Sequence, residues 1–296
     1  MRRYPGPVLP AFRHGSSRIH GRVRPGGHGA QGEHGRHRAP DAARGPRLGP
    51  GRLTIWHAEQ GTGEPVVLLH STAADSGMWD AQWEALSERF RVIKVDFRGY
   101  GRSPYRADGP YSDSGDVARL LAALEISRAA LVSSSGAGKV ALELAAAGLA
   151  DRLVLLNPIS ALPPTPDLRA YWDEEERLLE QGDTQGAAEL NARTLLGPEA
   201  SAEAWERLVA MQRHAFEAQL AADPEPEQVE KELSPPAIDV PALVVAGGHD
   251  LPYFADSARH LAAELPRARL VELEWAGHLP ALERPEEISA LLLDYL

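Results

Sequence analysis

The stretch Leu131-Val-Ser-Ser-Ser135-Gly-Ala-Gly138 ends a short apolar run and leads into a longer run that begins near Lys139. Apolar runs of about four to eight residues are typical of buried strands, whereas apolar residues three and four positions apart are typical of helices. The small residues between the two runs allow the chain to turn sharply. The sequence therefore predicts a buried strand that passes directly into a helix at this point.

A sharp strand-to-helix turn exposes one side chain, and the residues two before and two after it must be small. With Ser135 at the exposed position, these residues are Ser133 and Ala137. With Ser134 there instead, Val132 would occupy the tight position. The register therefore favours Ser135, whose hydroxyl is a candidate nucleophile.

The same glycines allow two nucleotide-binding interpretations. The segment Gly136-Ala-Gly138-Lys-Val-Ala141 fits a relaxed dinucleotide fingerprint, which would predict a nucleotide-dependent oxidoreductase. That fingerprint is followed about 20 residues later by an acidic residue at a strand end, where this chain has Asn157. A phosphate-binding loop needs a Ser or Thr directly after its lysine. Val140 follows Lys139, so such a loop is excluded. We therefore expect no nucleotide cofactor.

The rest of the chain alternates short apolar runs with longer helical ones. Strands are predicted at 66–69, 91–96, 130–133, 152–156, 242–246 and 268–273. Helices are predicted at 78–90, 113–125, 138–149, 256–265 and 285–296. Strand and helix in alternation predict an α/β fold with a doubly wound, mostly parallel sheet.

Residues 160–236 interrupt this alternation with helix-like sequence only. The segment holds seventeen acidic residues against six basic ones, together with bulky apolar side chains such as Trp172, Trp205, Met211 and Phe216. We interpret it as a helical lid on a core formed by 51–159 and 237–296. Apolar side chains that line a pocket under such a lid would favour a small, partly apolar substrate.

Residues 1–50 differ from the rest in composition. They contain ten Arg, no Lys and two acidic residues, a net charge of about +8, with ten Gly and seven Pro. Such a segment cannot bury enough apolar surface to offset its ordering entropy, so it is predicted to be a disordered extension. It could be a basic arm for nucleic acid or membrane, but its arginines are dispersed among glycines, which favours a dispensable extension.

Net charge and cysteine content exclude several classes of protein. The net charge of −11 argues against nucleic acid as a partner of the whole chain. No apolar run approaches the roughly 18 residues of a membrane span, and Pro5, Pro7 and Pro10 interrupt the only candidate export signal. We therefore expect a cytoplasmic protein without a membrane partner. The absence of cysteine excludes disulfides and a cysteine nucleophile.

Further motifs link the elbow to a known family. They are Val67-Leu-Leu-His70-Ser71, Asp75-Ser-Gly-Met-Trp79, Asp96-Phe-Arg98-Gly99-Tyr-Gly101-Arg-Ser103, Val244-Val-Ala-Gly-Gly-His249-Asp250 and Trp275-Ala-Gly277-His278-Leu-Pro-Ala-Leu-Glu283-Arg-Pro285. In order and spacing they resemble the α/β-hydrolase family over nearly all of residues 53 to 296. The resemblance implies an α/β-hydrolase fold with a helical lid insertion.

The resemblance also implies a catalytic triad. Ser135 would be the nucleophile, His278 the base and Asp250 the acid that orients the imidazole, in the chain order typical of this fold. This set predicts a serine hydrolase that cleaves a small carboxylic ester or lactone through an acyl-enzyme. Within the resemblance, the lid pattern is most similar to the enol-lactonase group. No cofactor and no metal are expected.

Two backbone N–H groups are implied as oxyanion donors, those of Gly136 and Thr72. Ser71 replaces the glycine that is usual before the second donor, which leaves Ala73 as a further candidate.

Other polar residues near these motifs have structural interpretations. Asp256 competes as the acid but is predicted to cap a helix. His249 lies beside the predicted acid at a variable position, and His70 is expected to support its loop. Asp96 and Arg98 are expected to fix a turn.

The triad does not by itself name the reaction. Carbon–carbon bond hydrolysis, amide hydrolysis and perhydrolysis remain alternatives, as does a signalling or receptor protein that kept the triad for ligand recognition. The oligomeric state is left open.

Overall fold

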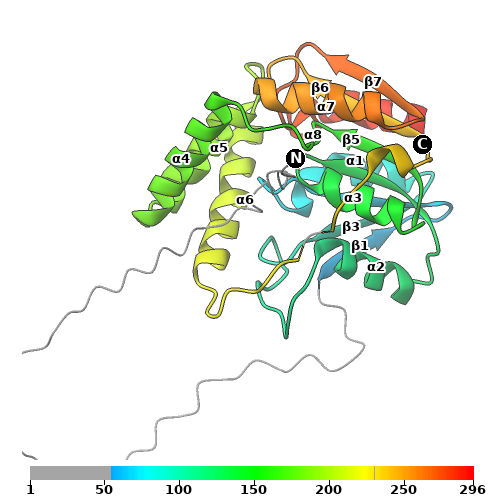
Figure 1. The fold of residues 1–296 in the computed structure, drawn as a ribbon, viewed down its shortest axis with the longest axis horizontal. Helices are drawn as coiled ribbons and strands as arrows, with labels where there is room; N and C mark the ends of the chain where they lie inside the picture. The colour runs from blue at the N-terminus through cyan, green and yellow to red at the C-terminus, as the bar shows by residue number, and fades with distance from the viewer. Residues whose placement is uncertain (1–54, 230) are drawn as a thin grey trace, which may run out of the picture. The chain divides into compact units, whose positions relative to one another are not determined.

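A seven-stranded sheet forms the centre of the computed structural model, which describes residues 55–229 and 231–296 (Figure 1). The predicted extension, residues 1–50, lies outside the described residues. The strands are β1 (Trp56–Gln60), β2 (Pro65–Leu69), β3 (Arg91–Asp96), β4 (Ala129–Ser134), β5 (Ala150–Leu156), β6 (Ala242–Gly247) and β7 (Ala268–Leu273). Their order is β1-β3-β2-β4-β5-β6-β7, and every neighbouring pair is parallel except β1 with β3. The predicted α/β class and mostly parallel sheet are confirmed.

Helices cover both faces of the sheet. They are α1 (Asp80–Ser87), α2 (Asp113–Ala123), α3 (Ala137–Ala146), α7 (Pro252–Glu264) and α9 (Pro285–Tyr295), with the short turns η1 (Ser76–Trp79), η2 (Pro235–Ala237) and α8 (Pro280–Glu283). The connection from β2 to β3 runs toward one edge of the sheet, and those from β3 to β4, β4 to β5 and β6 to β7 run toward the other. Because such crossovers are right-handed, α1 lies on one face and α2, α3 and α7 lie on the opposite face. Helix α9 packs against α1.

The central strands are buried on both sides. All six residues of β4 and all six of β6 are buried. Strands that are covered on both faces appear in the sequence as continuous apolar runs rather than as alternating apolar and polar residues. For this reason they could be predicted from the sequence. On one face of the sheet, side chains such as Leu131 of β4 and Val244 of β6 join those of α2, α3 and α7 in one hydrophobic core.

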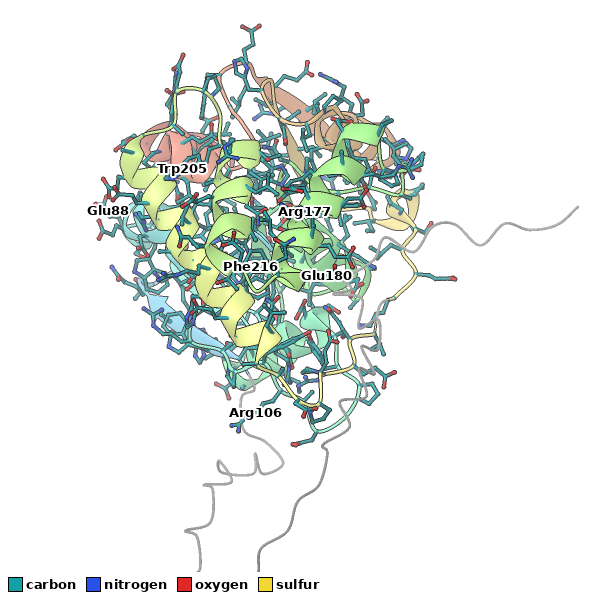
Figure 2. All side chains as sticks on the ribbon, turned by 90° about the vertical axis from the view of Figure 1, so that its left-hand side faces the viewer. Glu88, Arg106, Arg177, Glu180, Trp205 and Phe216 are labelled. Carbon is teal, nitrogen blue, oxygen red and sulfur yellow. The ribbon has the colours of Figure 1, made fainter. Side chains whose placement is uncertain are left out.

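Three helices form an insertion between β5 and β6: α4 (Pro166–Glu180), α5 (Thr184–Leu195) and α6 (Ala202–Leu220). Figure 1 shows them gathered beside the sheet. They share a small core of Leu179, Ala187, Ala188 and Phe216, and Figure 2 places Phe216 where α6 faces the other two helices. We call residues 160–236 the helical insertion. Its role as a lid stays a prediction. Among the described residues, no helix combines the length and apolarity needed to cross a membrane.

Two details differ from the sequence predictions. Strand β1 was not predicted, because its residues are half-buried or exposed and it lies antiparallel at the sheet edge. The predicted helix cap at Asp256 is wrong: α7 begins at Pro252, and the exposed Asp256 lies inside the helix, paired with Arg259 at 3.1 Å. Pro252 is the signal that marks the true start, because proline suits the first turn of a helix.

The topology brings the carboxyl ends of all the parallel strands to the same side of the sheet. Strands β2 to β7 are parallel to one another, so the residues that follow them meet there. The strand order reverses between the neighbours β2 and β4. Open α/β sheets bind ligands outside the carboxyl ends of the strands at such a switch point, so the site is expected there.

Candidate active site

Ser135 lies at the turn between β4 and α3 in a strained backbone conformation. Its φ is +56°, a left-handed conformation that costs a non-glycine residue on the order of 1 kcal/mol or more. The Ser135 N–H donates to the carbonyl of Leu156 at 2.8 Å, and its own carbonyl accepts from the Gly138 N–H at 2.9 Å. These bonds hold the predicted elbow and present the Ser135 hydroxyl at the edge of the sheet.

The glycines that follow Ser135 are needed for close packing. A Cβ on Gly136 would lie 3.1 Å from Thr72 Cγ2, and a Cβ on Gly138 would lie 3.1 Å from Pro158 Cβ. Both separations are tighter than ordinary van der Waals contacts. The two residues predicted to supply oxyanion donors, Gly136 and Thr72, are therefore in direct contact across the switch point.

A continuous hydrogen-bond relay joins Ser135, His278 and Asp250. Ser135 Oγ lies 2.7 Å from His278 Nε2, and His278 Nδ1 lies 2.7 Å from Asp250 Oδ2. The side chains of His278 and Asp250 are 1% and 0% exposed. The other carboxylate oxygen of Asp250 accepts the Leu251 N–H at 2.7 Å. Because a carboxylate only accepts, the relay assigns the proton to Nδ1 and leaves Nε2 to accept the serine proton.

The competing residues lie outside this relay. Ser134 is the last residue of β4, and its buried Oγ has no hydrogen-bond partner within the described residues. Asp256 is exposed and ion-paired on α7, and His249 is exposed. The structure thus brings together the three residues that the sequence predicted as nucleophile, base and acid.

His70 is held in its neutral form at the end of β2. Its Nδ1 lies 2.8 Å from the Ser71 carbonyl, and its Nε2 accepts the Phe97 N–H at 2.9 Å. Burial lowers its pKa, against the opposing hydrogen bond to Ser71 and the charge of Asp96. Both ring nitrogens are engaged by backbone, which agrees with the expected loop-supporting role.

Asp96 and Arg98 also make structural contacts. The Asp96 carboxylate accepts the backbone N–H of Ser76 at 2.9 Å and of Arg102 at 2.8 Å. The Arg98 guanidinium forms a buried two-pronged ion pair with Asp116, at 2.5 and 3.0 Å. These bonds fix the loops after β2 and β3, as the sequence predicted.

The structure separates the two candidates for the second oxyanion donor. The Ala73 N–H donates to Ser71 Oγ at 3.1 Å and is therefore occupied. The N–H groups of Thr72 and Gly136 make no hydrogen bond with another group of the described residues. Of the two candidates, only Thr72 has a backbone N–H that remains available to an oxyanion next to Ser135.

Two supporting residues were missed by sequence reasoning. Asn157, at φ +45°, donates from Nδ2 to the Gly277 carbonyl and accepts the Gly247 N–H at Oδ1, both at 2.8 Å. The ring of Phe254 lies 4.0 Å from that of His278, centroid to centroid. An asparagine directly after a buried strand is a usable signal, since asparagine tolerates left-handed backbone. Nothing in the sequence marks the phenylalanine. No cluster of metal-ligating side chains occurs in the described part of the chain.

Comparison with known families places the chain. The model of the "Alpha/beta hydrolase family" matches residues 66–291. The chain belongs to the alpha/beta hydrolase family. This hydrolase is 30% identical over 263 residues to a protein named "Putative carbamate hydrolase RutD" from Caulobacter sp. (strain K31), over 81% of this chain and 93% of the relative.

Two solved structures are also similar to this α/β hydrolase. The enol-lactonase from Burkholderia xenovorans LB400 has a TM-score of 0.64 and 29% identity, covering 81% of this chain and 95% of that one. A thermophilic esterase from Thermogutta terrifontis has a TM-score of 0.66 and 27% identity, covering 81% and 92%. The predicted family resemblance is confirmed, and hydrolysis is the reaction class that the comparisons support.

Proposed function

We propose that this chain is a serine hydrolase that cleaves a small carboxylic ester or lactone through an acyl-enzyme on Ser135. The observation that carries the proposal is the relay of 2.7 Å contacts from Ser135 through His278 to Asp250, on a strained elbow. Nucleophile, base and orienting acid within hydrogen-bond reach are the signature of nucleophilic catalysis.

The first half-reaction follows from the relay. His278 Nε2 takes the Ser135 proton while Oγ attacks the acyl carbon, and a tetrahedral oxyanion forms. The imidazolium is stabilised by the Asp250 carboxylate. It then protonates the leaving alcohol oxygen as the acyl–oxygen bond breaks, which leaves the acyl-enzyme and a neutral His278.

Water completes the cycle by the same steps. His278 takes a proton from water, the hydroxide oxygen bonds to the acyl carbon, and Ser135 Oγ leaves with the proton returned by His278. The products are a carboxylic acid and an alcohol, joined in one molecule when the substrate is a lactone. No step requires a cofactor or metal.

Thr72 and Gly136 would stabilise the oxyanion. Their backbone N–H groups are uncommitted in the described structure and belong to residues in contact beside Ser135. A single donor of this kind commonly supplies about 3 to 4 kcal/mol of transition-state stabilisation.

The contacts of the helical insertion support its interpretation as a lid. Arg207 on α6 donates to the Gly77 carbonyl at 2.7 Å, and His214 Nε2 lies 2.9 Å from the Gly101 carbonyl. Both carbonyls belong to loops at the carboxyl ends of β2 and β3, at the edge that holds Ser135. An insertion anchored there limits the space above the nucleophile, which favours a small, partly apolar substrate.

A carbamate is a second candidate substrate, favoured by the name of the 30% identical relative. The same triad would attack its carbonyl carbon. The two candidate substrates differ in the substituents of the carbonyl carbon. Besides the carbonyl oxygen, this carbon bears a carbon and an oxygen in the ester, and a nitrogen and an oxygen in the carbamate.

Turnover of matched small substrates tests the proposal. Purified full-length chain would be assayed on short aryl esters, on five- and six-membered lactones and on the aryl carbamate of the same alcohol, with Ser135→Ala as the matched inactive variant. The proposal expects hydrolysis of an ester or lactone that Ser135→Ala lowers by several orders of magnitude. Activity on the carbamate alone would favour the second candidate. Ester turnover that survives Ser135→Ala would contradict both.

A further inference from the structure

The loop that carries His278 is fixed through its backbone N–H groups. The Gly277 N–H donates to Glu283 Oε2 at 2.8 Å, and the Leu279 N–H donates to Glu283 Oε1 at 3.1 Å. Between them, the His278 N–H donates to the carbonyl of Leu195 at 2.7 Å. One carboxylate therefore holds the residues on both sides of the histidine, and the last residue of α5 holds the histidine itself.

The helical insertion reaches this loop through a close crossing of two glycines. The Gly197 N–H also interacts with the Glu283 carboxylate and lowers the pKa of its carboxyl. A Cβ on Gly197 would lie 2.5 Å from Glu283 Oε2 and 2.8 Å from the Gly277 nitrogen, so that only glycine fits. Glu283 thus joins the segment after α5 and the His278 loop in one contact.

Glu283 is itself firmly placed. It ends the single turn α8 and is 8% exposed. Burial raises the pKa of its carboxyl, while the hydrogen bonds from Gly277 and Leu279, the Gly197 N–H and the charge of His278 act in the opposite direction. The neighbouring Arg284 pairs outward with Glu199 and Glu287. The interactions that favour a charged Glu283 therefore come from the His278 loop and from Gly197.

We propose that Glu283 is a positioning residue, which anchors the His278 loop to the end of α5 and so keeps the imidazole within reach of both Ser135 and Asp250. This inference rests on the proposed function of the relay. Displacement of a catalytic group by about 1 Å can lower the rate by about 100-fold, so a carboxylate that fixes the loop on both sides affects turnover without touching substrate.

The variant Glu283→Gln tests the role directly. Glutamine keeps the shape of the side chain, but its NH2 group only donates, so it cannot accept from one of the two N–H groups, those of Gly277 and Leu279, that Glu283 holds. We expect kcat to fall about 10- to 100-fold while KM changes by less than about threefold. The exposed Glu286→Gln makes the same substitution nearby and should leave kcat unchanged.

A second variant disturbs the contact between Glu283 and the segment after α5. Gly197→Ala forces a methyl group against Glu283 and Gly277 and should also lower kcat with little change in KM. Gly109→Ala is its control, because a Cβ there would meet nothing within 4 Å. Backbone hydrogen exchange of residues 277–279 gives a readout independent of activity, and we expect it to accelerate in Glu283→Gln and in Gly197→Ala but in neither control.

The outcomes separate this inference from the proposed function. If wild type hydrolyses esters and Glu283→Gln keeps the wild-type kcat and exchange rates, the positioning role is overturned. If Glu283→Gln does not fold, Gly197→Ala decides in the same way. A wild-type chain that neither turns over esters nor forms an adduct at Ser135 would contradict the proposed function, and the positioning role with it, whatever the exchange data show.

Discussion

Glu175 offers a quantitative prediction on stability. This residue of α4 is only 3% exposed, and its Oε1 has no hydrogen-bond partner within the described residues. Burial raises the pKa of the carboxyl to about 7, and the nearby side-chain amide of Asn191 opposes only part of that effect. Ionised Glu175 therefore destabilises the helical insertion.

The sign and size of the effect follow from linkage. Between its ordinary pKa of 4.5 and about 7, the folded chain keeps a proton on Glu175 that the unfolded chain has released. The free energy of unfolding therefore falls as pH rises through this window, and the loss is complete above the folded pKa. At about 1.36 kcal/mol per pKa unit, the displacement corresponds to about 3 kcal/mol.

Urea unfolding of wild type and Glu175→Gln tests this prediction. The two chains should have similar free energies of unfolding at about pH 5, and the variant should be more stable by about 2 to 3 kcal/mol at about pH 8.5. Other groups such as Asp113, whose pKa burial also raises to about 7, titrate in both chains and cancel. The exposed neighbour Glu176→Gln is the control. If wild type and Glu175→Gln lose stability equally with rising pH, the buried carboxyl does not carry this cost and the reasoning is wrong.

Three further predictions concern the site. Asp250→Asn should lower kcat by about three to four orders of magnitude with little change in KM. Asp256→Asn, on an exposed face of α7, should keep the wild-type kcat. Steady-state kinetics of both variants would show the reverse if Asp256 were the catalytic acid. Activity should be lost toward acid pH, since protonated His278 cannot accept the serine proton, and a pH–rate profile flat through the acid range would rule out this base. His70→Ala should lower the free energy of unfolding by about 2 to 4 kcal/mol, because two buried backbone groups lose their partner; unchanged urea unfolding would exclude the supporting role.

The sheet was predictable because the apolar pattern of each buried strand lies within a few consecutive residues. Buried parallel strands read as apolar runs, so six of the seven strands were predicted to within about two residues at each end, in line with the usual uncertainty. The edge strand β1 lacks such a run and was missed. Ser135 was predictable because a tight turn demands small residues at fixed offsets, and Asp250 and His278 because each follows a strand within a family motif.

The contacts that support the site could not be predicted from sequence. The bond from His278 to Leu195 and the crossing of Gly197 with Gly277 join segments that are distant along the chain, and their meeting depends on how α5 ends. The cap assigned to Asp256 failed for a local reason, since Pro252 already begins the helix. The choice between Thr72 and Ala73 needed the position of a single hydroxyl, that of Ser71.

Covalent labelling by a fluorophosphonate tests the central claim most directly, because it requires an accessible serine activated by its histidine. Intact and digested protein would be analysed by mass spectrometry after reaction of wild type, Ser135→Ala, Ser134→Ala and His278→Gln. We predict one adduct per chain at Ser135, unchanged in Ser134→Ala, strongly slowed in His278→Gln and absent in Ser135→Ala. An adduct at Ser134, or ester turnover by a chain that the reagent leaves unlabelled at Ser135, would contradict it.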